Sequence, residues 1–388
     1  MSKSTASNDE AEQRPCAMLP LLLASLAAAV AAGPVSDQLS VTTYNEGKTA
    51  LSGEVIFEDN FDELDMVTWQ HELTLWGGGN WEFEGYNNNR TNSFIRDGVL
   101  FIKPTLTAER FGEEFLYSGT LDMNGGAPYD QCTCALSYGC SRTGSADNII
   151  NPIMSAAVRT PLSFSFTYGT VEVRAKMPAG DWIWPAIWMM PVREAYGNWP
   201  TSGEIDIVES RGNKDLSCGD GPQIGTQQVA STMHWGADFP SNQWPLTHYE
   251  LNDEAGFDTD FHIYKVVWTP DGLTFSVDDN EIGTAAPPEG GFWEMGGFDQ
   301  DTWRNNPWAG RSKMAPFDQP FYIKFNVAVG GTGGFIPDGC TNGNGAKPWS
   351  NTSPHAPKEF WEGRDQWLPT WNGDDTAMQI DYVRVTAL

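Results

Sequence analysis

Alternating apolar and polar residues constrain the fold of this chain more than any other feature. In residues 168–178, YGTVEVRAKMP, the apolar Val171, Val173 and Ala175 alternate with charged residues. A period of two residues is typical of a strand with one face buried and the other in water, because successive side chains of a strand point to opposite faces. This segment therefore predicts a half-buried β-strand.

Other segments extend the same pattern. Residues 261–283 contain two such runs around Pro270-Asp271-Gly272, residue types that favour a tight turn, so we expect a hairpin there. Two further strand candidates are residues 319–331 and 378–385. The 17 Trp, 20 Phe and 11 Tyr among 40 Gly and 25 Pro suit many short strands joined by turns, and no comparable helical period follows residue 32. We predict an all-β fold, an antiparallel sandwich of two sheets, curved if it holds a polymer.

The chain of 388 residues divides into a leader and one domain. Residues 17–32 form an apolar run that is too short to span a bilayer comfortably and ends in an Ala-x-Ala cleavage pattern. It predicts a secretory signal, and hence a secreted, extracellular protein with no membrane span. We expect residues 1–33 to be removed and residues 34–54 to form a short N-terminal segment. Residues 55–388 are expected to form one domain, because no repeat, linker or shift in composition interrupts them.

The formal net charge of -28 limits the partners. Such a charge repels phosphate and sulfate groups, so we expect no nucleic-acid partner, and a strongly anionic polysaccharide is a poor substrate. A neutral partner fits better, and a monomer is expected. The acidic residues also keep a secreted protein soluble, which is a sufficient reason for most of them.

Cysteine usage bears on disulfides and metals. Removal of the signal would leave five cysteines, so at most two disulfides can form and one thiol is expected to be left over. Three of the five lie in CTCALSYGC, but this spacing matches no common zinc site and no histidine lies nearby. We therefore expect a disulfide-pinned loop there rather than a metal site. The five cysteines are Cys132, Cys134, Cys140, Cys218 and Cys340.

Three carboxylates crowd into the short stretch WPTSGEIDIVESRGN. In a regular strand Glu204 and Asp206 would share one face, and Glu209 would point to the other. A β-bulge at residues 207–208 would add one residue and reset this alternation, and bulges are common beside active sites. We therefore expect all three acids to line one surface. An exposed acidic strand without chemistry is the alternative.

With the bulge, the spacing of the acids suits retaining glycoside hydrolysis. Glu204 and Glu209 would lie about four strand steps apart, roughly 13 Å between Cα atoms at about 3.3 Å per residue. Side chains that lean together would bring the carboxylates to about 5–6 Å, the separation used when one acid attacks and the other donates a proton. Glu204 is then the nucleophile and Glu209 the acid/base. Asp206 would share a hydrogen bond with Glu204 and oppose the ionisation of Glu209.

Aromatic residues near the acids are candidates for contacts with a sugar. The apolar faces of sugar rings stack on indole, so Trp184, Trp188 and Trp199 are candidate walls of a binding surface. The alternative is that such residues are core, given the large area that each buries, and the sequence does not separate Trp184 from Trp188. His234, in STMHWG, is a candidate hydrogen-bond partner of a catalytic carboxylate, although a lone histidine is more often structural.

The stretch GEIDIVES resembles the Glu-x-Asp-x-x-Glu signature of glycoside hydrolase family 16, in the longer, bulged form found in laminarinases, which are endo-β-1,3-glucanases. The similarity extends over SFTYGTVEVRAKMPAGDWIWPAIWMMP, STMHWG, FDQPFYIKFNVAVGG and IDYVRV, and so covers most of residues 55–388. It implies a β-jelly-roll with a concave cleft. It also implies that Glu204 is the nucleophile, Asp206 an assisting acid and Glu209 the acid/base.

The resemblance implies roles for residues outside the signature as well. Asn88, in YNNNRTN, resembles an asparagine that contacts a sugar in the negative subsites. Asp381 and the backbone of Gly98 resemble a structural calcium site on the convex face, although calcium usually takes six or more oxygen ligands. No cofactor is expected for catalysis. The residues that match positions in the cleft are Arg174, Trp184, Trp188 and His234.

The resemblance is also close to invertebrate β-1,3-glucan-recognition proteins, which bind the glucan without cleaving it. Many of those have lost a catalytic Glu, whereas Glu204 and Glu209 are both present here, and the chain between the expected cleavage site and Val55 is too short for their extra N-terminal module. We predict a secreted, retaining endo-β-1,3-glucanase that acts on neutral β-1,3-glucan. A non-catalytic recognition protein of innate immunity is the alternative. The balance between hydrolysis and transglycosylation, and the tolerance of mixed β-1,3/1,4 linkages, stay open.

Overall fold

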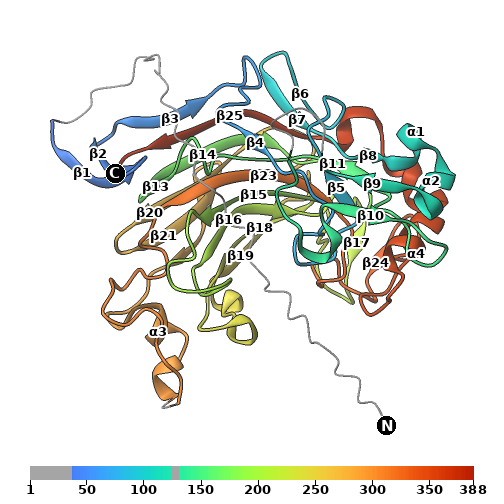
Figure 1. Ribbon diagram of the computed structural model, residues 1–388. Helices are drawn as coiled ribbons and strands as arrows, with labels where there is room; N and C mark the ends of the chain where they lie inside the picture. The colour runs from blue at the N-terminus through green and yellow to red at the C-terminus, as the bar shows by residue number, and fades with distance from the viewer. Residues whose placement is uncertain (1–36, 125–130, 302) are drawn as a thin grey trace, which may run out of the picture.

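Two large sheets lie face to face in the computed structural model, which describes residues 37–124, 131–301 and 303–388 (Figure 1). The expected secretory signal, residues 1–33, lies outside the described residues. The sheets are antiparallel and do not close into a barrel. The prediction of an all-β, two-sheet jelly-roll sandwich is confirmed. Among the described residues, no helix has the length and apolar character needed to cross a membrane.

The first sheet has ten strands. They are β1 (Leu39–Tyr44), β2 (Lys48–Leu51), β4 (Gln70–His71), β12 (Ala157–Arg159), β13 (Phe166–Thr167), β15 (Ile183–Pro191), β16 (Glu204–Ser210), β18 (Gln228–His234), β19 (His248–Asn252) and β23 (Phe321–Val329). Their order is β19-β18-β16-β15-β23-β13-β1-β2, and β12 joins β4 to β23. Because β1 pairs with β13, part of the expected N-terminal segment 34–54 is built into this sheet.

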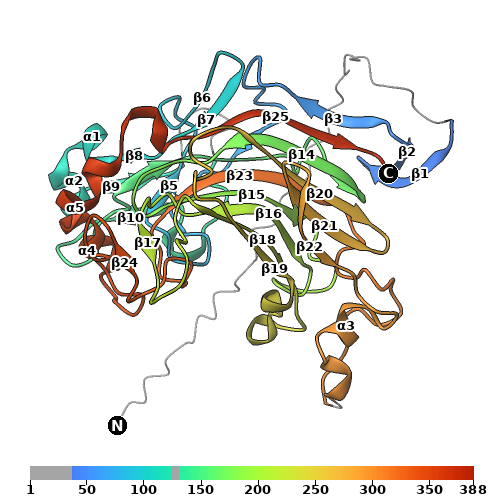
Figure 2. The ribbon, with the colours of Figure 1, turned by 180° about the vertical axis from the view of Figure 1, so that it is seen from behind.

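The second sheet has eight strands and packs over the first, as both views show (Figures 1 and 2). They are β3 (Val55–Asp59), β6 (Ser93–Arg96), β7 (Val99–Ile102), β14 (Gly169–Lys176), β20 (His262–Thr269), β21 (Gly272–Val277), β22 (Asn280–Ala285) and β25 (Met378–Thr386). Their order is β22-β21-β20-β14-β25-β7-β6, with β3 paired to β25. The strands predicted from alternation are thus confirmed as β14, β20, β21, β23 and β25.

Short elements fill the connections. Three small sheets contain β5 (Glu84–Tyr86), β8 (Thr105–Leu106) and β11 (Ile153–Ser155); β9 (Thr120–Asp122) and β10 (Ser141–Thr143); and β17 (Leu216–Ser217) and β24 (Thr341–Asn342). The helices are α1 (Thr107–Phe111), α2 (Glu113–Ser118), α3 (Gly291–Met295), α4 (Ala356–Glu362) and α5 (Arg364–Trp367). The 3₁₀ turns are η1 (Leu136–Tyr138), η2 (Phe239–Ser241), η3 (Trp244–Thr247), η4 (Phe298–Gln300), η5 (Leu368–Thr370) and η6 (Gly373–Thr376). Each is too short to show a helical period, which is why the sequence did not reveal them.

The main hydrophobic core lies between the two sheets. On β14 the side chains of Val171, Val173 and Ala175 are fully buried, and they alternate with polar residues on the outer face, as the sequence predicts. On β16 of the other sheet, Ile205 and Ile207 belong to the same core. The side chains of β16 that are not in the core must therefore lie on its opposite face.

Two disulfides pin the connections between the described strands. One joins Cys132 to Cys140, and so confirms the expected pinned loop in CTCALSYGC. The other joins Cys218 to Cys340 across 122 residues of sequence. None of the cysteines in the described residues is free, Cys134 included. The expectation of one leftover thiol concerned the chain after removal of the signal, and it stays a prediction.

Candidate active site

The strand β16 carries the three acids, and its pairing with β18 contains the expected bulge. Asp206 lies opposite Thr232, and Glu209 lies opposite Ala230. Three steps along β16 thus match only two steps along β18, so one residue is extra at positions 207–208. The bulge prediction is confirmed, and it brings Glu209 back to the face that carries Asp206.

The two residues of the bulge point their side chains inward and bond their backbone locally. Ile207 and Val208 are both 1 % exposed and both belong to the main core, although they are consecutive. Ser231 of β18 donates its hydroxyl proton to the carbonyl of Ile207 over 2.6 Å. This bond satisfies a buried carbonyl at the point where the ladder is irregular.

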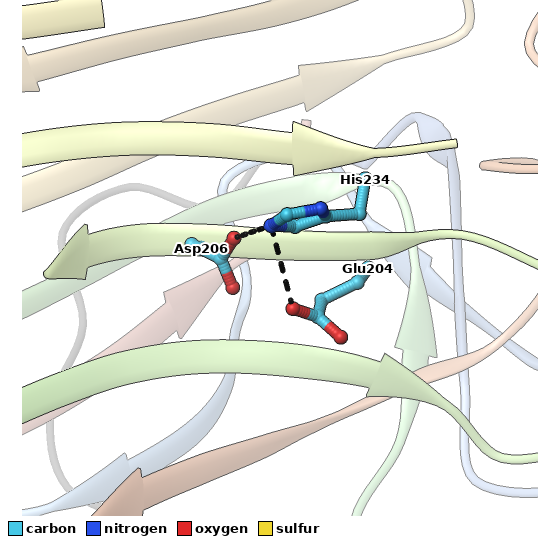
Figure 3. Close-up of side chains that lie close together, drawn as sticks. All are labelled: Glu204, Asp206 and His234. Atoms are coloured by element: carbon cyan, nitrogen blue, oxygen red, sulfur yellow. Dashed lines mark ion pairs between the residues drawn. The ribbon is translucent and has the colours of Figure 1, made fainter. Parts of the chain in front are cut away.

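Glu204, Asp206 and His234 form the centre of the site (Figure 3). Glu204 begins β16 and lies opposite His234, the last residue of β18. The His234 Nε2 atom is 3.8 Å from Oε1 of Glu204 and 3.3 Å from Oδ2 of Asp206. Trp199 donates its indole N–H to the other Glu204 oxygen, Oε2, over 2.8 Å. Each carboxylate of this pair thus faces at least one nitrogen.

The electrostatics of the pair disfavour ionisation of both acids at once. Burial raises the pKa of Glu204 to about 8, and the charge of Asp206 adds to the effect. Burial, reinforced by the charge of Glu209, raises the pKa of Asp206 well above its usual range. Asp206 is 3 % exposed, and its Oδ2 atom has no hydrogen-bond donor among the described residues. Two buried carboxyls this close are expected to share a proton at neutral pH.

Glu209 has its own donor at the other end of the strand. Trp184 of β15 donates its indole N–H to Oε1 of Glu209 over 2.8 Å. The Trp184 ring stacks on Phe335, with centroids 4.0 Å apart and planes at 8°. Arg211 lies over the same Phe335 ring and donates its Nε–H to the carbonyl of Phe335 over 2.7 Å. Phe335 therefore holds two side chains that lie beside Glu209.

Trp188 takes a different place from Trp184. It lies opposite Asp206 in the β15–β16 pairing, and its indole N–H donates to Oδ1 of Asn326 over 2.6 Å. Asn326 in turn donates to the hydroxyl of Tyr86 over 2.9 Å. The ammonium of Lys324 lies 4.4 Å from the centroid of the Trp188 ring. The structure thus separates the two tryptophans that the sequence left equivalent.

A buried ion-pair cluster continues the same sheet from β23 to β4 and β12. Oε1 of Glu72 is 2.9 Å from Nζ of Lys324 and 3.0 Å from the guanidinium of Arg159. Burial alone would raise the pKa of Glu72, but the two cations bring it below its usual value. Both cations pair with this one carboxylate, so each of them has an acidic partner within the sheet.

The structure does not bring Arg174 to the acids. Arg174 lies on the outer face of β14 in the second sheet, where it forms an ion pair with Asp381 over 2.6 Å. Its expected place among the cleft residues is therefore wrong, because β14 turns its alternate side chains away from the core on the convex side. Asn88 follows β5 and accepts hydrogen bonds from Arg90. Its contact with a sugar stays a prediction.

The residues expected to hold calcium do not fit a cation. Asp381 is already paired with Arg174, whose positive charge opposes a second cation at the same carboxylate. Gly98 is a turn residue with a φ of 74° between β6 and β7. Across the described ranges, the one group of three acidic, histidine or cysteine ligands that lie close enough for a metal is Glu204, Asp206 and His234, within 4.8 Å. Calcium at Asp381 therefore has no support from its surroundings.

The sequence reasoning missed several residues of the site. Arg211 lies two residues after Glu209, so the period of the strand could have placed it on the same face. Asn326 lies within a strand that was predicted, but no pattern marks its partner Trp188. Asn242, whose Nδ2 atom lies 2.8 Å from Nδ1 of His234, and Phe335 both lie in loops, where no period exists, so the sequence carried no signal for them.

Comparisons with known proteins agree on one family. Residues 140–302 match the model of the glycosyl hydrolases family 16. A β-1,3-glucan-binding protein of Penaeus monodon is 53% identical over 341 residues, which cover 85% of this chain and 89% of the relative. A β-1,3-glucan-binding protein 1 of Manduca sexta is 35% identical over 90% of this chain and 68% of the relative. A glucan endo-1,3-beta-glucosidase A1 of Niallia circulans is 31% identical over 78% of this chain and 38% of the relative.

Solved structures show the same fold. The laminarinase of Rhodothermus marinus superposes with a TM-score of 0.52 at 24% identity, over 86% of this chain and 97% of that one. An endo-β-1,3-glucanase of Pyrococcus furiosus gives a TM-score of 0.52 at 21% identity, over 88% of this chain and 96% of that one. At these identities the likeness concerns the fold alone.

Proposed function

The chain belongs to glycosyl hydrolase family 16, in the group that contains laminarinase-like enzymes and β-1,3-glucan-binding proteins, and we propose that it is a secreted, retaining endo-β-1,3-glucanase. One observation carries the proposal. The bulge in β16 returns Glu209 to the face of Asp206, and each of the outer acids accepts an indole N–H, Glu204 from Trp199 and Glu209 from Trp184. An exposed acidic strand without chemistry would have no need of these two indole donors.

The first step of the proposed reaction is a displacement on the sugar. A carboxylate oxygen of Glu204 attacks the anomeric carbon, while Glu209 gives its proton to the glycosidic oxygen. The bond between that carbon and oxygen breaks, and the remaining chain leaves with a free hydroxyl. A covalent glycosyl ester on Glu204 results.

The second step restores the enzyme. Glu209, now a carboxylate, takes a proton from water, and the water oxygen attacks the anomeric carbon from the opposite side. The ester bond breaks and Glu204 leaves as a carboxylate. Two inversions retain the configuration of the sugar. If another sugar hydroxyl replaces water, the same step gives transglycosylation.

Asp206 has the role of proton holder in this scheme. The nucleophile must be ionised, yet the pKa of Glu204 is raised to about 8 by burial and by the charge of Asp206. A proton on the more deeply buried Asp206 removes that opposing charge, and the N–H of Trp199 then stabilises the Glu204 carboxylate. A protonated Asp206 keeps the hydrogen bond to Glu204 that the sequence-based hypothesis proposed, and departs from its second part, in which the negative charge of Asp206 acts on Glu209.

Charge and disulfides support the proposed substrate and compartment. A net charge of -28 supports a neutral β-1,3-glucan such as laminarin rather than a sulfated polymer. Two disulfides in the described residues support an oxidising compartment, in line with the expected signal. A monomer is expected.

A β-1,3-glucan recognition protein is the second candidate. It is favoured by the names of the relatives, because the Penaeus monodon protein, which is 53% identical, is called a β-1,3-glucan-binding protein. The same cleft would then hold the glucan without cleaving it. The two candidates share the ligand and differ only in whether Glu204 reacts.

The test compares the purified protein with its Glu204→Gln variant on laminarin. We expect new reducing ends from the wild type, and a rate at least about 1,000-fold lower from the variant, because the nearly isosteric amide cannot attack. Glu254→Gln, at an exposed position, is the matched control and should keep full activity. Binding of laminarin should persist in the variant. Binding by the wild type without any release of reducing ends would overturn the enzyme in favour of the recognition protein.

A further inference from the structure

We propose that Asn242 is a positioning residue that holds His234 in one tautomer, with the ring proton on Nε2, so that an N–H group faces Glu204 and Asp206. Asn242 lies in the loop between η2 and η3, eight residues after His234. In the contacts that define the site, Asn242 touches neither Glu204 nor Asp206. It would therefore act on these carboxylates only through the imidazole of His234. The part of the proposal that concerns activity rests on the proposed function, whereas the tautomer itself does not.

The orientation of the Asn242 amide is set by the backbone around it. Its Oδ1 atom accepts the backbone N–H of Trp235 over 3.3 Å and that of Trp244 over 3.2 Å. Only the oxygen of an amide can accept from N–H groups, so a flipped side chain would place two donors against two donors. The amide nitrogen must therefore be the atom that faces His234.

This orientation determines which ring nitrogen of His234 carries the proton. The Nδ2 atom of Asn242 lies 2.8 Å from Nδ1 of His234. An amide NH₂ group can only donate, so Nδ1 must present its lone pair. In a neutral imidazole the proton is then on Nε2. Protonation of Nδ1 would direct its hydrogen at the hydrogens of Asn242.

The Nε2 proton faces the carboxylates of Asp206 and Glu204. Nε2 is 3.3 Å from Oδ2 of Asp206, which has no hydrogen-bond donor among the described residues, and 3.8 Å from Oε1 of Glu204. An N–H at this place stabilises negative charge on either carboxylate. The other tautomer would direct a lone pair at two acceptors and disfavour the ionised nucleophile.

The ring plane is held as well as the proton. The imidazole of His234 packs against Trp199, with centroids 5.4 Å apart, and against Trp244, at 6.5 Å. Trp199 also donates to Glu204, and Trp244 supplies one of the N–H groups that orient Asn242. The loop after β18 thus fixes the position, the plane and the tautomer of one side chain.

The direct test is spectroscopic and needs no catalysis. Protein labelled with ¹⁵N at histidine is measured by long-range ¹H–¹⁵N correlation at pH 8, and the signals of His234 are assigned by their loss in His234→Gln. We expect the wild type to show a protonated Nε2 and an unprotonated Nδ1. Asn242→Asp should reverse the pattern, because a carboxylate only accepts and so places the single proton of the neutral ring on Nδ1. A wild-type spectrum with the proton on Nδ1 would overturn the proposal, whatever the variants do.

The second arm measures laminarin hydrolysis. Asn242→Asp should lower kcat at least about 10-fold and change KM less than about 2-fold, because the ring loses its N–H toward the nucleophile but the cleft keeps its shape. Asn252→Asp, on the neighbouring strand β19, introduces the same charge without touching His234 and should keep kcat within about 2-fold. Asn242→Ser, whose hydroxyl can donate to Nδ1, should retain more activity than Asn242→Asp. Equal losses in Asn242→Asp and Asn252→Asp would mean that charge alone acts, and would overturn the role of the tautomer.

The two proposals fail separately. If laminarin is bound but not cleaved, the enzyme proposal fails while the spectrum of His234 still tests the tautomer. If laminarin is cleaved and the spectrum shows the proton on Nδ1, the positioning role of Asn242 fails alone.

Discussion

At the scale of single residues, Glu204 shows most clearly that a group needed for the reaction can destabilise the fold. Its carboxyl lies beside Asp206 with little access to water, and burial raises its pKa from 4.5 to about 8. The folded protein therefore binds more protons than the unfolded chain between those two values. The stability of the fold must fall as the pH rises through this window, since a raised pKa of an acid opposes the ionised form.

Replacing the Glu204 carboxylate by an amide should remove this loss of stability. At pH 8 we expect Glu204→Gln to be more stable than the wild type by about 2 kcal/mol, a value discounted for the sharing of charge with Asp206. At pH 4 Glu204 and Asp206 are both protonated in the folded protein. The difference in the free energy of unfolding between Glu204→Gln and the wild type should then be close to zero. Unfolding by urea at the two pH values measures it, with the exposed Glu254→Gln as the control. A gain of equal size at both pH values would show that the effect is not one of ionisation.

Residue identities near the acids could be predicted better than their roles. Glu204, Asp206 and Glu209 follow from their spacing once a bulge is allowed, and His234 lies on the strand beside them. Arg174 was assigned to the cleft from the resemblance alone, and the alternation of its strand could not correct this, because alternation predicts two faces without saying which sheet the strand joins. Trp184 and Trp188 have the same residue type and similar neighbours, so their partners could come only from the three-dimensional packing.

At the scale of elements, the bulge in β16 is the device that makes the site. It leaves Ile207 and Val208 both in the core and gives the carbonyl of Ile207 a side-chain donor, Ser231, in place of a regular ladder partner. A bulge is stable only if such groups are satisfied, because an unpaired buried carbonyl destabilises the fold. The direction of Glu209 therefore depends on a hydroxyl on the next strand.

Ser231→Ala should reveal this dependence. We expect a loss of about 1–3 kcal/mol in the free energy of unfolding, and a fall of roughly 10-fold in kcat on laminarin as Glu209 loses its fixed direction. Ser210→Ala is a matched control, because Ser210 is equally buried and donates to the carbonyl of Gln228 over 2.9 Å, beyond the bulge, where the pairing with β18 is regular again. It should cost similar stability and leave kcat nearly unchanged. Unaltered kcat in Ser231→Ala would mean that the bulge holds its shape without the hydroxyl.

The elements that the sequence predicted are those with a clear period. The strands β14, β20, β21, β23 and β25 are each at least six residues long, and the turn after Thr269 uses residue types suited to it. Short helices and two-residue strands have no room for a period, so they were not found. The loops that carry Asn242 and Phe335 are ordered by their contacts with other segments, and such contacts leave no local pattern.

At the scale of the whole molecule, disulfides hold distant loops against the two sheets. The disulfide between Cys218 and Cys340 joins the connection after β17 to the segment before β24. That segment includes Phe335, on which Trp184 stacks while it donates to Glu209. The Cys132–Cys140 disulfide joins residues that are only eight positions apart in the sequence. One bridge therefore restrains the site and the other restrains a local loop.

Replacing the cysteines of each bridge in pairs by serine should separate these effects. In the chain-entropy model, loss of the bridge across 122 residues costs about 5 kcal/mol, and loss of the one across eight residues costs about 2.5 kcal/mol. Guanidinium unfolding curves of the two double variants test this order. Hydrolysis of laminarin tests the link to function, because Phe335 loses its tether only when Cys218 and Cys340 are replaced. We expect kcat to fall in that variant and to stay near the wild-type value in the other. Equal kcat values at 25 °C would mean that the stacking of Phe335 on Trp184 alone keeps the loop in place, and that the long bridge serves stability without supporting Glu209.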